Sequence, residues 1–108
     1  MKLNILAVAV TATVTASPCL ADSGTSVDNA YRLCAVFDGT GLTSSKCSVS
    51  GWNSSVDVKI DMTSGEARKL CVQVAALARQ KGMTFDPGWQ IRIYSPYSGD
   101  NTIAFCQL

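Results

Sequence analysis

The clearest alternation of hydrophobic and polar residues flanks a helical pattern in the middle of the chain. Apolar residues occupy every second position from Val56 to Met62, and again from Trp89 to Ile93. A period of two is typical of a strand with one buried face. Between these segments, apolar or small residues recur at the spacing of a helix with one buried stripe: Ala67, Leu70, Cys71, Val74, Leu77 and Ala78. The pattern predicts a β-α-β unit over residues 56–94.

Local signals at both ends of the central helix fix its limits. Thr63-Ser-Gly-Glu66 matches a capping box, in which the Thr63 hydroxyl and the Glu66 carboxylate bond each other's backbone N–H. Gly82 supplies a residue that adopts left-handed backbone angles easily, so the helix is expected to end near Lys81. Residues 86–88, Asp-Pro-Gly, fit a type II turn into the next strand.

Weaker patterns extend this unit on both sides. A helix is expected from Thr25 to Gly39, and a short strand from Lys46 to Trp52. The terminal segment 102–108 is apolar at both odd and even positions, which predicts a strand buried on both faces. A turn-rich loop over 95–101 joins it to the strand at 89–94 as a hairpin.

This element order, α-β-β-α-β-β, predicts an α+β fold. The two short connections favour antiparallel hairpins, whereas the long helical crossover brings its two strands back parallel. A terminal strand buried on both faces would fit between those parallel strands. We therefore expect a four-stranded antiparallel sheet in the order 1-2-4-3, with two helices on one face.

Residues 1–21 are typical of a secretory signal peptide. Lys2 precedes a polar-poor stretch, and Ser-Pro-Cys-Leu-Ala leads to a cleavage site after Ala21. The stretch is shorter than the roughly 20 apolar residues that span a bilayer, which disfavours a membrane anchor. Pro18 before Cys19 disfavours a lipid anchor. We expect residues 22–108 to form one small domain in the periplasm or outside the cell, with no membrane attachment.

Signal cleavage leaves four cysteines, which indicate two disulfides in a small exported chain: Cys34, Cys47, Cys71 and Cys106. The alternatives are buried free thiols and a zinc site. Zinc is disfavoured because no C-x₂-C spacing and no histidine occurs. Three pairings are possible from the count alone. The expected architecture places Cys71 over Cys106 and Cys34 beside Cys47, and each bridge should contribute about 3 to 4 kcal/mol.

Charge and composition exclude several classes of function. Without Lys2, eight basic residues balance eight acidic ones. The sequence has no basic cluster, which disfavours a nucleic-acid partner. The absence of histidine excludes Ser-His-Asp and Cys-His catalysis within this chain. Asp57 and Asp61 would lie about 13 Å apart along a strand, farther than the carboxylate pairs of glycosidases. We expect no metal, no cofactor and no catalysis.

A candidate binding surface follows from the alternation in the terminal strand. If Ala104 and Cys106 face the helices, the intervening residues point to the opposite, uncovered face. The candidate residues on this face and the adjacent hairpin are Trp52, Arg92, Tyr94, Tyr97, Ile103 and Phe105. Two alternatives remain open: a β-bulge would return Ile103 and Phe105 to the core, and the charged residues could form a merely solvating ladder.

The sequence favours a small exported protein-binding module of a bacterial periplasm, for example an inhibitor or immunity protein against a secreted enzyme. Its partner would be another protein. One alternative is a structural envelope protein that associates with itself as a homodimer. A second alternative is a small secreted hydrolase that uses carboxylates.

Overall fold

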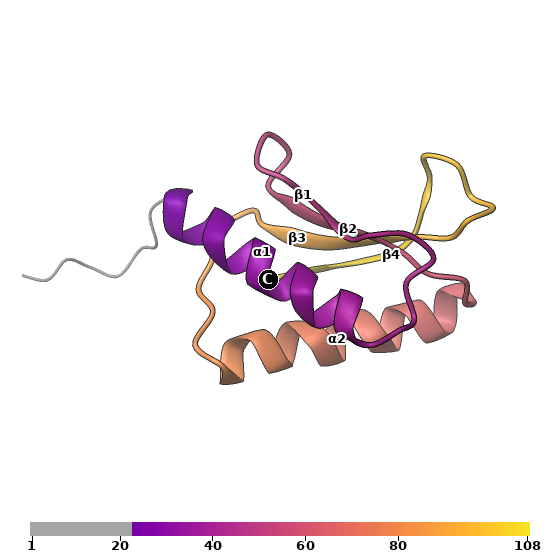
Figure 1. Ribbon diagram of the computed structural model, residues 1–108, viewed down its shortest axis with the longest axis horizontal. Coiled ribbons are helices and arrows are strands. Elements are labelled where there is room, and N and C mark those ends of the chain that lie inside the picture. Colours follow the sequence, from indigo (N-terminus) through magenta and orange to yellow (C-terminus); the bar gives the residue numbers. More distant parts are fainter. Residues whose placement is uncertain (1–22) are drawn as a thin grey trace, which may run out of the picture.

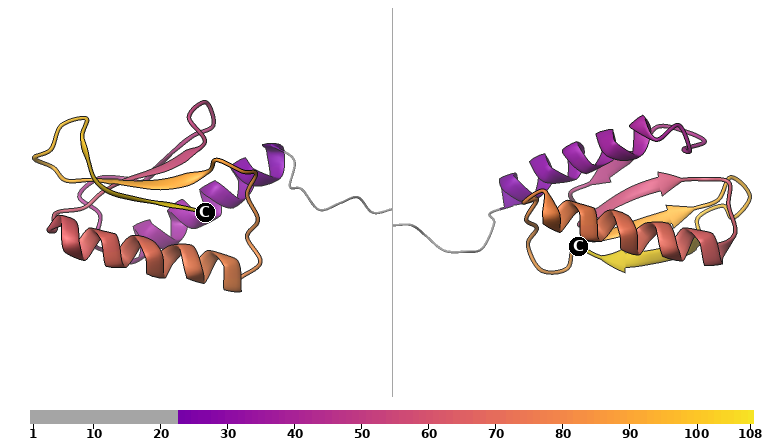
Figure 2. Two further views of the ribbon diagram at one scale, coloured as in Figure 1. Left: turned by 180° about the vertical axis from the view of Figure 1, so that it is seen from behind. Right: turned by 90° about the horizontal axis from the view of Figure 1, so that it is seen from below.

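Residues 23–108 of the computed structural model form a four-stranded sheet with two helices on one face (Figure 1). The expected signal peptide and its cleavage site lie outside the described residues. The elements follow the predicted order: α1 Ser23–Gly39, β1 Ser48–Ser50, β2 Ser55–Lys59, α2 Ser64–Gln80, β3 Gln90–Tyr94 and β4 Thr102–Gln107. α1 packs on β1 and β2, whereas α2 packs mainly on β3 and β4, so the helices share the sheet between them (Figure 2).

The strand order is β1-β2-β3-β4, and the sheet is mixed. β2 and β3 are parallel neighbours, while β1–β2 and β3–β4 are antiparallel. The predicted order 1-2-4-3 and the fully antiparallel sheet are therefore wrong. The helical crossover places β3 directly beside β2, and parallel pairing satisfies their backbone groups without an inserted strand. β4 lies at the edge, and Phe105 on its second face is exposed.

Side chains of the four strands line up in rows on the helix-facing side of the sheet. One row contains Val49, Val56, Ile91 and Cys106, and the next contains Val58, Ile93 and Ala104. The members from β2 and β3 are at most 1% exposed. The hydrophobic core is therefore centred on the two inner strands, where both neighbours and both helices exclude water.

Two polar side chains attach the start of α1 to the segment between α2 and β3. The Ser26 hydroxyl accepts a hydrogen bond from the Asp86 backbone N–H at 2.8 Å. The Asn29 amide donates to the Thr84 carbonyl at 2.9 Å. Both side chains are buried, and these bonds satisfy groups that would otherwise be costly to remove from water.

Each helix is bound covalently to another part of the fold. Disulfides join Cys34 to Cys47 and Cys71 to Cys106, with Cα–Cα distances of 5.3 and 6.0 Å. This confirms the predicted pairing. The first bridge connects α1 to the residue just before β1, and the second connects α2 to β4.

The predicted capping box is present at the start of α2. Glu66 N–H donates to the Thr63 hydroxyl at 3.2 Å, and Thr63 N–H donates to the Glu66 carboxylate at 3.1 Å. The hydrogen bonds from Thr63 lower the pKa of Glu66 below its ordinary value of 4.5. At the other end, Lys81 caps the helix and Gly82 adopts a φ of 74°, as the sequence predicted.

The lowered pKa of Glu66 predicts an acid-side dependence of stability. A carboxyl group with a lower pKa in the folded state stabilises the protein above its unfolded pKa, and this contribution is lost as pH falls through the folded pKa. Glu66→Gln keeps a capping side chain that does not titrate. Urea denaturation from about pH 6 to about pH 3 should give a smaller loss of stability for this variant than for the wild type. Equal losses would contradict the role of Glu66.

Candidate functional site

The sheet surface turned away from the helices, here called the open face, is the candidate functional site. No helix in residues 23–108 covers it (Figure 1). Strand register places three rows of side chains on this face. They are Ser50, Ser55, Gln90 and Gln107; then Ser48, Asp57, Arg92 and Phe105; then Lys59, Tyr94 and Thr102.

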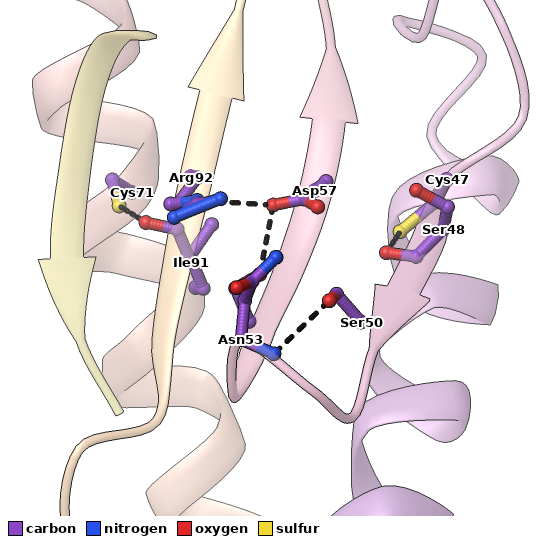
Figure 3. A network of polar contacts seen from close by, with 9 residues as sticks. Cys47, Ser48, Ser50, Asn53, Asp57, Cys71, Ile91 and Arg92 are labelled. Carbon is purple, nitrogen blue, oxygen red and sulfur yellow. Dashed lines mark hydrogen bonds and ion pairs between the residues drawn. The ribbon is translucent and has the colours of Figure 1, made fainter.

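The middle row combines an ion pair with an exposed aromatic ring. Arg92 Nε lies 3.3 Å from Asp57 Oδ1 (Figure 3), and the Ser55 hydroxyl donates to the same carboxylate oxygen at 3.0 Å. Phe105, opposite Arg92 on β4, is 60% exposed. The two side chains are about a quarter exposed, and a surface ion pair of this kind adds only about 0 to 1 kcal/mol of stability. It orients the Arg92 guanidinium toward Asp57 on the open face, one strand away from Phe105.

Two loops rise from opposite ends of the sheet, on the side of the open face (Figure 1). One is the turn at 51–54 between β1 and β2, and the other is the loop at 95–101 between β3 and β4. Each carries an aromatic side chain in solvent: Trp52 is 97% exposed and Tyr97 is 82% exposed. The open face therefore lies between two projecting aromatic residues.

Local hydrogen bonds hold both loops in shape. Asn53 N–H donates to the Ser50 hydroxyl at 3.1 Å in the first loop (Figure 3). In the second, Ser95 N–H donates to the Ser98 hydroxyl at 3.0 Å, and Tyr97 N–H donates to the Ser95 hydroxyl at 2.9 Å. Such side-chain to backbone bonds are typical of tight turns. The two aromatic residues are thus presented on defined turns.

The open face is hollowed next to the 95–101 loop. A cavity of about 390 Å³ lies there, lined by Gln90, Arg92, Tyr94, Asp100, Asn101, Thr102 and Phe105. Amide, hydroxyl and charged side chains line this cavity together with the phenyl ring of Phe105. Such a lining can receive a side chain that has both an apolar body and a polar end.

The structure brings together three of the predicted site residues. Arg92, Tyr94 and Phe105 share the open face, whereas Trp52 and Tyr97 lie in the loops at its two ends. Ile103 does not belong to the site. A register shift between β3 and β4 at Ile93 and Tyr94 makes Ile103 an extra residue, and it packs against the core.

Sequence reasoning missed four residues that line the cavity: Gln90, Asp100, Asn101 and Thr102. Gln90 carried a usable signal, because its alternation with the buried Ile91 and Ile93 places it on the open face. The other three depend on the path of the 95–101 loop and the start of β4. No local pattern predicts that path.

The described residues show no grouping that would hold a metal ion. Within 23–108, no three or more His, Cys, Asp or Glu side chains are clustered. Asp57 is bonded by Ser55 and Arg92, and Glu66 belongs to the helix cap. None of the helices in this part of the chain is long and apolar enough to cross a membrane.

Comparison with known proteins provides no relative for this site. No family model matches the chain, and no curated protein or solved structure matches it. The functional interpretation therefore depends on the geometry of the open face and its loops.

Proposed function

We propose that this protein is an exported protein-binding module that recognises another protein through its open face. The observation that carries the proposal is the position of Phe105, exposed at the centre of β4, between loops that project Trp52 and Tyr97. Exposed aromatic side chains and arginine are the residues most often found at the energetic centres of protein interfaces. An exposed surface of this kind on a small domain favours a binding role.

The chemistry of the face favours a protein surface as the partner. Arg92 and Asp57 offer one charge of each sign, and Gln90 and Asn101 add amide groups near Phe105. A face with mixed charge and amide groups suits polar and aromatic side chains of another protein. The open face has no basic cluster of the kind that binds nucleic acid. An inhibitor or immunity-type protein that binds a secreted enzyme fits this description.

The covalent framework supports tight binding and an exported location. One disulfide ties α1 to the residue before β1 and the other ties α2 to β4, so little ordering of the backbone would be required on association. Disulfides of this density are typical of small proteins in oxidising compartments. These disulfides therefore support the periplasm or the extracellular space as its proposed location.

The proposal predicts that Phe105→Ser and Trp52→Ser abolish partner binding while the domain stays folded. Both side chains are mostly exposed, so each change should alter stability by no more than about 1 kcal/mol. The test is affinity capture of proteins from an envelope extract by the immobilised protein, with mass spectrometry of what is retained. Thermal unfolding of each variant reports its fold.

The matched control is Tyr31→Ser on α1, behind the sheet, because Tyr31 is 61% exposed and resembles Phe105 in exposure. A partner that binds the open face is captured by the wild type and by the control, and lost with both site variants. Equal capture by all four proteins would contradict the proposal. Unfolding of Phe105→Ser would show that the ring is part of the core.

A further inference from the structure

The outer edge of β4 is a second surface of the molecule. The hydrogen bonds made by β3 indicate which backbone groups of β4 are free to pair with another strand. Gln90 N–H donates to the Ser54 carbonyl at 3.0 Å, and the Tyr94 carbonyl accepts from Ile60 at 2.8 Å. Residues 90, 92 and 94 therefore direct their backbone groups to the β2 side. Because these directions alternate along a strand, Ile91 and Ile93 direct theirs to β4.

The register then fixes the orientation of β4. Ile91 lies opposite Cys106 and Ile93 opposite Ala104, so the backbone groups of residues 104 and 106 bond β3. The N–H and C=O groups of Phe105 and Gln107 point away from the sheet. β4 thus presents an edge on which another strand can pair.

α2 leaves this edge accessible. Beside it lies a hollow of about 280 Å³, lined by Arg68 of α2 and by residues 102–105 of β4. Phe105, in the middle of the strand, is 60% exposed. A strand added to β4 would cover this ring and occupy the space next to the edge.

β4 also lacks the features by which proteins protect exposed edges. Such edges are usually very short, or carry lysine, proline or inward-pointing charges. β4 has six residues, Thr102–Gln107, with no charged residue and no proline among them. The opposite edge, β1, has three residues and directly follows a disulfide-bonded cysteine. The difference indicates that β4 is the pairing edge.

We propose that two copies of the protein pair β4 to β4, antiparallel, across a two-fold axis at Phe105. In this register Phe105 faces Phe105 of the partner subunit, and the two residues exchange N–H to C=O hydrogen bonds. An uncharged strand pairs with itself without like-charge repulsion, which favours a second copy as the occupant. The result is a continuous eight-stranded sheet with both helix layers on one side. This assembly rests on the strand edge and covers Phe105, so the dimer and the partner proposed for the open face would compete for this residue.

Analytical ultracentrifugation of the purified protein tests this assembly. A dimer is expected at concentrations on the order of 100 µM. Phe105→Lys places a charge at the axis, and Gln107→Pro removes an outward N–H without adding charge. Each should raise the dimer dissociation constant by at least about tenfold. Tyr31→Lys on α1 introduces the same charge away from the edge and should leave the dimer unchanged.

A cross-linking measurement checks the register. At the axis, the Cα atoms of Phe105 and its copy would be about 5.5 Å apart, within the range that a disulfide bridges. Phe105→Cys should therefore form a covalent dimer in a glutathione redox buffer, whereas Gln107→Cys, off the axis, should not. A protein that is monomeric at all concentrations, or a Gln107→Pro variant that dimerises like the wild type, would overturn the proposal. If only the Trp52→Ser variant lost capture of the partner protein, the proposal of β4-to-β4 pairing would not be affected.

Discussion

Replacing Cys71 and Cys106 together with alanine is expected to lower the free energy of unfolding by about 4 kcal/mol. The bridge closes a segment with a sequence separation of 35 residues, which includes most of α2, all of β3 and most of β4. Its removal gives the unfolded chain more conformational freedom. Cys71 is also fully buried between α2 and the sheet, so the loss of its sulfur removes packing. Urea denaturation under non-reducing conditions measures the change.

The matched control is Cys34→Ala with Cys47→Ala, which opens a smaller loop with a sequence separation of 13. The expected loss is about 3 kcal/mol, because the entropy of loop closure increases with loop length. Native proteins have a total stability of about 5 to 15 kcal/mol, so removal of both bridges, about 7 kcal/mol together, would unfold the chain if its stability lies at the lower end of that range. A larger loss for the control than for the Cys71–Cys106 variant would contradict this ranking.

The features that the sequence predicted correctly are those set by residues close together in the chain. Thr63 and Glu66 define the start of α2 because the capping box spans one helical turn. The alternation at 56–60 and 89–93 predicted β2 and β3 because side chains on a strand alternate between faces. The disulfide pairing was correct although the strand order was wrong. Cys106 faces α2 in either order, because the pairing depends only on the face of β4.

The strand order could not be predicted from the same patterns. The apolar residues on both sides of β4 were interpreted as burial on two faces, but Phe105 is exposed and Ile103 is accommodated by a bulge. The bulge depends on the register between strands that are separated by a loop. For the site, alternation placed Arg92, Tyr94 and Phe105 on one face, whereas the contribution of Asp100 depends on the 95–101 loop. Both features are set by contacts that no local pattern specifies.

Proline substitution at Gln90 and at Gln107 should have different effects on stability, because Gln90 lies on the central strand β3 and Gln107 on the edge strand β4. These residues lie opposite each other in the sheet, on β3 and β4. Gln90 N–H donates to the Ser54 carbonyl at 3.0 Å, so Gln90→Pro removes this hydrogen bond, leaves the carbonyl without its donor and should cost about 1 to 3 kcal/mol. Gln107 N–H points outward, so Gln107→Pro should cost less than about 1 kcal/mol.

The measurement is chemical denaturation of both variants at concentrations low enough for the protein to be monomeric, so that loss of strand pairing between copies does not contribute. Gln90 and Gln107 have the same side chain and lie directly opposite each other in the strand register. They differ in whether the backbone N–H is hydrogen-bonded. If β4 were a central strand, its amides would all bond a neighbouring strand. Gln107→Pro would then be as destabilising as Gln90→Pro, and that outcome would contradict both the observed strand order and the free edge on which pairing of two copies depends.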